Sequence, residues 1–230
     1  MKLLILVPLY QIAATRYQHD QPIYTGNTGN LNQFIDLTDV DRETILHRHN
    51  HWRNLAAGGN LPYGEDNYKE LPDGELNLYA KRMDKMFYDM DLERNARDWA
   101  GKCVWAHSGP EGHQGLPYSY SENLYLTSVK SGATFFQQAS DSWASEFQDY
   151  YHSNGNKRGT VGHYTQMIWK SSTRVGCASA ICDGFTEGMS EFSGTIVVCQ
   201  YSGPGNYYGQ LPTEWSSNVL ELGSECQFGR

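Results

Sequence analysis

Gly162 to Trp169 read GHYTQMIW, and about thirty residues further on Cys199 to Tyr207 read CQYSGPGNY. Both stretches mix aromatic and polar residues, so that rings can pack while polar groups reach a surface. The run at 195–201 and a similar run at 175–181 are β-rich, and a loop with three glycines joins them. This pattern predicts a long antiparallel hairpin.

Helical periodicity dominates the first half of the chain. Helices are predicted at residues 38–57, 76–103, 121–128 and 133–151, the second with a break near Asp91. Asp41 stands three residues after Thr38, which predicts a weaker form of capping box at the first helix. In the last and clearest helix Glu146 lies at the edge of the buried stripe. Helices followed by strands predict an α+β fold in which helices cover an antiparallel sheet.

Composition and termini predict a secreted protein. Eighteen basic and twenty-six acidic residues give a net charge of -8 without a cluster of Lys or Arg, which argues against a nucleic-acid partner. Residues 1–15 combine Lys2, an apolar run and small residues, as a signal peptide does. A loose arm at 16–37, a folded domain at 38–215 and a tail at 216–230 are expected to follow. No later apolar segment is long enough for a transmembrane anchor.

Five cysteines suit an oxidising compartment, and two disulfides with one cysteine left over are the simplest arrangement. The cysteines are Cys103, Cys177, Cys182, Cys199 and Cys226. Their spacing alone leaves the pairing open.

Two histidines and two glutamates form the candidate site. They are His107, Glu122, Glu146 and His163. Imidazole nitrogen and carboxylate oxygen are ordinary ligands of a divalent ion such as zinc, but these four are far apart in the chain and only folding can bring them together. Three interpretations stay open: reversible metal binding, hydrogen-bonded pairing without a metal, and catalysis.

A second histidine pattern lies in the first helix. His47 and His51 are four residues apart and so could chelate a metal ion. We interpret both as facing solvent, with His49 between them packed inward.

The two opening stretches resemble the signature motifs of the CAP superfamily, also called SCP/TAPS, which includes venom allergen-like proteins. The resemblance runs from about residue 43 to 212. Its other matches are His49-Asn50 with Arg53, Cys103 followed by His107-Ser108, and Ser121 to Leu124. Two features depart from the pattern: Gly203 stands where proline is usual, and the loop at 58–75 is long.

This resemblance implies a three-layer α-β-α sandwich with a central antiparallel sheet. It places the four site residues in one cleft, where zinc or magnesium would bind weakly and would not be required for folding. It also implies disulfides Cys103–Cys177 and Cys182–Cys199. Lipid binding is the function it suggests, either of a sterol through an aromatic loop or of a fatty acid between helices 43–57 and 133–151. The aromatic residues are Tyr118, Tyr120 and Tyr125.

Catalytic motifs are lacking in the sequence. There is no Gly-x-Ser-x-Gly elbow and no His-Glu-x-x-His helix. Ser108 is adjacent to His107, but neighbouring side chains rarely face each other. No catalytic residue is therefore assigned. We expect a secreted, non-enzymatic, lipid-binding CAP protein with a metal-binding cleft. The first alternative is an extracellular hydrolase that uses the His/Glu cleft, with Glu122 and Glu146 as acid and base. The second is an immunomodulatory ligand that contacts extracellular proteins through its surface loops.

Overall fold

The computed structural model describes residues 27–58, 79–80, 83–109, 116, 118–130, 134–150, 157, 159–186, 189–213 and 215–216. The predicted signal peptide, Cys226 and nearly all of the predicted tail lie outside the described residues. None of the helices in these ranges is both long and apolar enough to cross a membrane.

The described elements include both helices and strands. In chain order they are β1 (Asn30–Ile35), α2 (Asp39–Gly58), β2 (Tyr79–Ala80), β3 (Phe87–Tyr88), α3 (Met90–Ala100), β4 (Tyr120–Thr127), α4 (Phe135–Ser145), a 3-10 helix (Glu146–Asp149), α5 (Gly162–Met167), β5 (Arg174–Gly184), β6 (Gly194–Ser202) and β7 (Trp215–Ser216).

The centre of the fold is the antiparallel hairpin of β5 and β6, as the β-rich runs predict. Its register pairs Val175 with Tyr201 and Cys177 with Cys199. β1 flanks β5, β4 flanks β6, and β3 adds a short parallel pair to β5. β2 and β7 form a separate two-stranded sheet. The central strands are buried along nearly their whole length.

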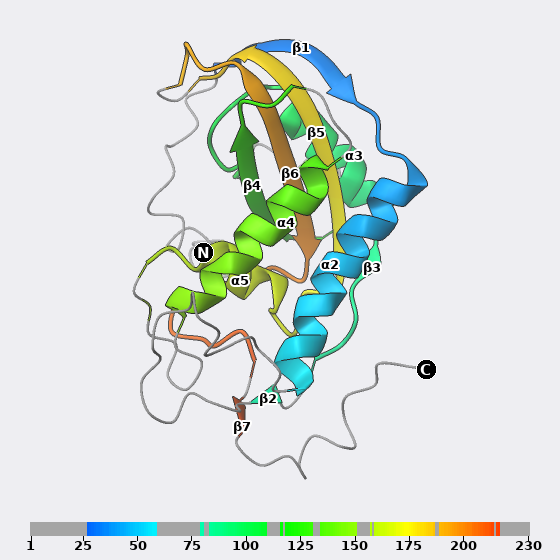
Figure 1. Cartoon of the computed structure of the whole chain (residues 1–230), viewed down its shortest axis with the longest axis vertical. Helices are drawn as coiled ribbons and strands as arrows, with labels where there is room; N and C mark the ends of the chain where they lie inside the picture. The colour runs from blue at the N-terminus through cyan, green and yellow to red at the C-terminus, as the bar shows by residue number, and fades with distance from the viewer. Residues whose placement is uncertain are drawn as a thin grey trace, which may run out of the picture.

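Helices lie on both faces of this sheet and make the three-layer α-β-α sandwich that was predicted (Figure 1). α2 and α4 cover one face, where their apolar side chains pack against Val175, Cys177 and Val197. α3 covers the opposite face, where Trp99 packs in a cluster with Ala178. The division follows from the two-residue period of a strand, which turns successive side chains to opposite faces.

Carboxylates set the starts of two helices. At α2, Asp41 Oδ2 accepts hydrogen bonds from the N–H and the hydroxyl of Thr38 at 2.8 and 2.6 Å, and Thr38 Oγ1 accepts from the Asp41 N–H at 3.2 Å. The predicted capping pair is thus confirmed. At α3, Asp89 Oδ1 accepts from the N–H groups of Asp91 and Leu92. This cap starts α3 at Met90, next to the break expected near Asp91, and the helix predicted ahead of it is wrong at 79–80 and 87–88, which form β2 and β3.

Two other segments differ from their predicted structure. Residues 121–128, predicted as a helix, lie almost entirely in β4, where each residue from Tyr120 to Thr127 pairs with β6. Residues 30–35, predicted within a loose arm, form β1 against β5. Both segments take their conformation from the neighbouring strand, which local periodicity does not reveal. The helix predicted at 133–151 is confirmed as α4, but it tightens into the 3-10 helix after Ser145.

The two disulfides differ from the expected pairs. Cys177 bonds Cys199, directly opposite in the β5–β6 register with Cα atoms 4.1 Å apart, and Cys182 bonds Cys103, with Cα atoms 5.9 Å apart. The pairs Cys103–Cys177 and Cys182–Cys199 are therefore wrong. The reason is side-chain direction: Cys177 and Cys199 face α2 and α4, whereas Cys182 faces α3, whose C-terminal end is followed by Cys103.

Candidate functional site

Glu146 and His163 form the first of two histidine–glutamate pairs. Glu146 follows α4 directly, and His163 lies in the first turn of α5. Glu146 Oε1 accepts from His163 Nδ1 at 2.6 Å, and its Oε2 accepts from the N–H groups of His163 and Tyr164 at 3.0 and 3.1 Å. The N–H groups at a helix start have no partner within the helix, so this carboxylate both caps α5 and orients the ring.

His107 and Glu122 form the second pair in a similar way. Glu122, in β4, accepts on Oε1 from His107 Nδ1 at 3.1 Å and from the Ser108 N–H at 3.0 Å. Its Oε2 accepts from Gln200 Nε2 at 2.9 Å, and Gln200 Oε1 accepts in turn from Asn95 Nδ2 at 2.6 Å. The carboxylate is thus held from β6 and α3. In each pair one carboxylate oxygen accepts from the histidine ring, and the same carboxylate also accepts from a nearby backbone N–H.

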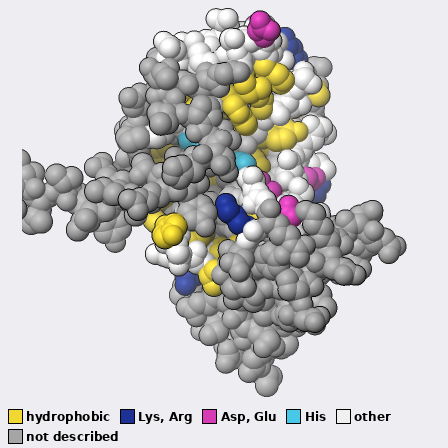
Figure 2. Space-filling model, turned by 90° about the vertical axis from the view of Figure 1, so that its left-hand side faces the viewer, with side chains coloured by type: hydrophobic (Ala, Val, Ile, Leu, Met, Phe, Trp, Pro, Cys, Tyr) yellow, Lys and Arg dark blue, Asp and Glu magenta, His cyan; other side chains and the backbone are white. Residues whose placement is uncertain are grey.

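These contacts settle the tautomer of both rings. A carboxylate oxygen only accepts, so each neutral ring donates from Nδ1 and keeps a lone pair on Nε2. No hydrogen bond to either Nε2 atom occurs within the described ranges. The side chains of His107 and His163 are 14% and 22% exposed, so both rings are partly open to solvent. Figure 2 shows histidine surface beside hydrophobic side chains on the face that carries α4 and α5.

The four predicted residues thus divide into two rings and two carboxylates that hold them. Asn123 links the pairs: it neighbours Glu122 in β4, and its Nδ2 donates to the His163 carbonyl at 3.1 Å. Among the residues that the structure describes, no three His, Cys, Asp or Glu side chains gather as metal ligands. A four-ligand cage is therefore not preformed there, and the arrangement instead offers two oriented imidazoles.

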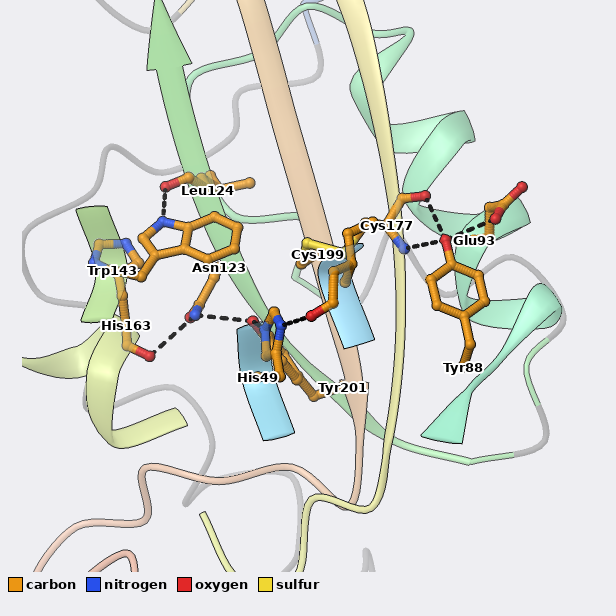
Figure 3. The surroundings of a disulfide bond; sticks show 11 residues. His49, Tyr88, Glu93, Asn123, Leu124, Trp143, His163, Cys177, Cys199 and Tyr201 are labelled. Atoms are coloured by element: carbon orange, nitrogen blue, oxygen red, sulfur yellow. Dashed lines mark hydrogen bonds between the residues drawn. A yellow bond between two sulfur atoms is a disulfide. The ribbon is translucent and has the colours of Figure 1, made fainter. Parts of the chain in front are cut away.

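A buried hydrogen-bond chain continues from Asn123 into the core (Figure 3). Asn123 Nδ2 donates to the Tyr201 hydroxyl at 3.0 Å, and this hydroxyl lies 2.9 Å from His49 Nε2. His49 Nδ1 lies 2.8 Å from the Ile45 carbonyl, which only accepts, so Nδ1 carries the proton and Tyr201 donates to Nε2. Burial lowers the pKa of His49 to about 4 and raises that of Tyr201. The prediction that His49 packs inward is confirmed.

Trp143 contacts both His163 and strand β4. Its ring stacks on the His163 ring with centroids 6.2 Å apart, and its Nε1 donates to the Leu124 carbonyl at 3.0 Å (Figure 3). Trp143, Gln200 and Tyr201 stand in stretches that the sequence singled out, but sequence reasoning gave none of them a role in the site. Each of the three carries a polar group among apolar neighbours in the sequence, and this was the signal that could have identified a role in the site.

The three candidate lipid-binding tyrosines do not gather at one place. The Tyr118 hydroxyl donates to Asp89 Oδ2 at 3.1 Å, and the Tyr120 hydroxyl lies 2.7 Å from Ser108 Oγ. Tyr125 packs with the cluster under α2 and α4, on the opposite face of β4 from Tyr120. Burial and the Glu122 carboxylate raise the pKa of Tyr120 to about 12, so its hydroxyl stays protonated.

The Ser108 hydroxyl, adjacent to His107 in the chain, is not hydrogen-bonded to either imidazole among the described residues. Its Oγ is engaged with the Tyr120 hydroxyl, while Glu122 holds His107 Nδ1. The four cysteines within the described ranges are all disulfide-bonded. This geometry offers ligand nitrogens more readily than the nucleophile–base pair that hydrolysis needs.

Sequence comparisons match this chain to one family. The model of the cysteine-rich secretory protein family, CAP, matches residues 46–201. Ancylostoma secreted protein of Ancylostoma caninum is 34% identical over 203 residues, which cover 83% of this chain and 41% of that protein. Salivary antigen-5 of Dipetalogaster maximus is 32% identical over 80% of this chain and 70% of that protein. This chain thus spans less than half of the first relative.

Solved structures show the same fold. The crystal structure of NaASP2 with Zn²⁺ has a TM-score of 0.56 at 27% identity and covers 78% of this chain and 88% of that one. Venom allergen-like protein 4 of Schistosoma mansoni has a TM-score of 0.59 at 20% identity, and the match covers 78% of this chain and 97% of that one. At this identity the match shows a common fold only.

Proposed function

Because this chain belongs to the CAP family of cysteine-rich secretory proteins, we propose that it is a secreted, non-enzymatic protein whose two histidine–glutamate pairs bind a divalent metal ion weakly. The observation that carries the proposal is the same in both pairs. A carboxylate holds ring Nδ1 and leaves Nε2 with its lone pair available. Carboxylate-oriented histidines of this kind are typical of metal sites. Secretion is supported by the two disulfides and by the names of the relatives.

The donor set favours zinc over magnesium. His107 and His163 would supply imidazole nitrogen, which zinc accepts, whereas magnesium prefers oxygen ligands. The oxygens of Glu122 and Glu146 already accept hydrogen bonds from rings and backbone. Water would then fill the remaining coordination positions, and affinity would be modest. A related protein, NaASP2, has been crystallised with Zn²⁺. Because both carboxylates and both Nδ1 atoms have hydrogen-bond partners without an ion, metal would not be needed for folding.

Calorimetric titration of the untagged protein with ZnCl₂ tests the proposal. We expect the single variants H107Q and H163Q to weaken the zinc binding of the cleft by at least about tenfold, and E146Q and E122Q by about 10–100-fold through loss of ring orientation. E191Q, an exposed glutamate elsewhere, serves as the matched control and should leave binding unchanged. Zinc binding that none of the four site variants alters would contradict the proposal. Hydrolytic turnover that H163Q abolishes would favour the hydrolase alternative.

Lipid binding is the second candidate function, and the arrangement of α2 and α4 supports its fatty-acid form. The two helices cover the same face of the sheet (Figure 1), and the seam includes Phe136 and Ala139 of α4. Leu46 and Trp52 of α2 pack there while only partly buried. An apolar chain laid along this seam would cover their exposed surface. The sterol form depends on Tyr118, which precedes β4, and on Tyr120 and Tyr125, which lie on opposite faces of β4, so it is less favoured.

A displacement assay with a fluorescent fatty acid tests the lipid candidate. We expect the protein to bind the probe and the variant A139F, which fills the seam, to bind it at least about tenfold more weakly, a loss of about 1.4 kcal/mol. Y118F removes one hydroxyl of the aromatic loop and should leave binding unchanged. If Y118F abolished binding and A139F did not, the fatty-acid site would not lie between α2 and α4.

A further inference from the structure

The outward face of α2 carries two exposed histidines on successive turns. His47 and His51 are both exposed, as their spacing predicts, and their rings lie parallel with centroids 6.3 Å apart and an interplanar angle of 10°. Residues four apart on a helix face the same direction, so both rings are available to one ligand. Neither ring belongs to the two histidine–glutamate pairs described above.

The helix beneath these rings is firmly held. Ile45, His49 and Arg53 on its inner face are fully buried. Arg53 donates from Nε to the Asp84 carbonyl at 2.7 Å and from Nη1 to the carbonyls of Met167 and Trp169 at 3.0 and 2.9 Å. The backbone that carries His47 and His51 is therefore fixed, while their exposed side chains can rotate to converge.

The charges around the pair suit a cation. Glu43 stands one turn before His47 on the same exposed face. Arg42 is bound to Glu93 and Asp39, and Arg48 is bound to Asp141 at 3.2 Å, so both nearby guanidinium groups are occupied by carboxylates. A metal ion at the pair would meet net negative charge.

We propose that His47 and His51 form a second metal site, in which two imidazole nitrogens chelate a divalent transition-metal ion of the copper(II) class. Two histidines at this spacing on one helix face are a known way to hold a metal ion. Imidazole suits copper, nickel and zinc, and affinity for a given nitrogen site is highest for copper(II). Because no third ligand group is gathered there among the described residues, water completes the coordination.

Titration of the untagged protein with CuCl₂, followed by calorimetry and by electron paramagnetic resonance, tests the site. The double variant H107Q/H163Q removes the cleft ligands and should still bind one Cu²⁺ with two imidazole nitrogens. Adding either H47Q or H51Q should weaken this binding by at least about tenfold, or about 1.4 kcal/mol. The change N54H, added to H47Q, places a new pair at 51 and 54 and should restore part of the affinity.

The outcomes separate this site from the cleft. If H107Q/H163Q does not fold, H47Q or H51Q in the otherwise unaltered protein should lower the number of bound Cu²⁺ ions by one. Cu²⁺ binding that survives both H47Q and H51Q in the H107Q/H163Q background, or an unchanged number of bound ions in the otherwise unaltered protein, would overturn the proposal. Loss with only one of the two variants would also overturn it, because a single histidine would then be the ligand.

Discussion

Replacing Cys103 and Cys182 together with alanine should lower the free energy of unfolding by about 4 kcal/mol. The disulfide joins residues separated by 79 positions, and a longer closed loop restricts the unfolded chain more strongly. It also ties the segment after α3 to the end of β5. Denaturant unfolding of both forms under non-reducing conditions measures the difference.

The double variant C177A/C199A is the matched control, since its bridge spans only 22 positions and should cost about 3 kcal/mol. Peptide mapping of the unreduced protein gives an independent test. A peptide linking Cys103 to Cys177 would contradict the bridges described here, as would a larger loss of stability in the control than in C103A/C182A.

His49 should make the protein sensitive to acid. In the folded protein the pKa of His49 is lowered from 6.5 to about 4 by burial, while the unfolded chain binds the proton near the ordinary value. The unfolded state therefore binds more protons between these values, and the free energy of unfolding falls as pH drops from 6.5 towards 4. The loss should total about 3 kcal/mol and should not grow further below pH 4 on account of this group.

Comparison with H49Q isolates this contribution, because a glutamine does not titrate. The difference in unfolding free energy between the wild type and H49Q should shrink by about 3 kcal/mol from pH 7 to pH 4. H51Q, an exposed histidine of the same helix, should keep the acid loss of the wild type. Parallel stability curves for the wild type and H49Q would refute the assignment. An NMR titration in which the folded His49 ring protonates above pH 6 would do the same.

The residues of the candidate site could be predicted from the sequence, but the separate roles of its histidines and glutamates could not. The resemblance placed His107, Glu122, Glu146 and His163 in one cleft, and the structure finds them in two hydrogen-bonded pairs joined through Asn123. Sequence reasoning left open whether the four residues bind a metal ion, pair through hydrogen bonds or catalyse a reaction. Only the coordinates show that each carboxylate holds a ring and backbone N–H groups, because hydrogen-bond direction depends on distances that spacing along the chain does not contain.

The sequence by itself determined the local features. The Thr38–Asp41 cap, the apolar stripe of α4 and the β-branched hairpin of β5 and β6 each depend on residues that are close along the chain. Short-range periodicity and capping chemistry record such contacts directly.

Tertiary structure alone decided the rest. Strand β4 in place of a helix, the bridge from Cys103 to Cys182 and the chain from His163 to His49 all join residues that are distant in sequence. A strand needs a partner to satisfy its backbone, and a disulfide needs two side chains facing the same side of the sheet. Those conditions are met only once the sheet and its helices have assembled.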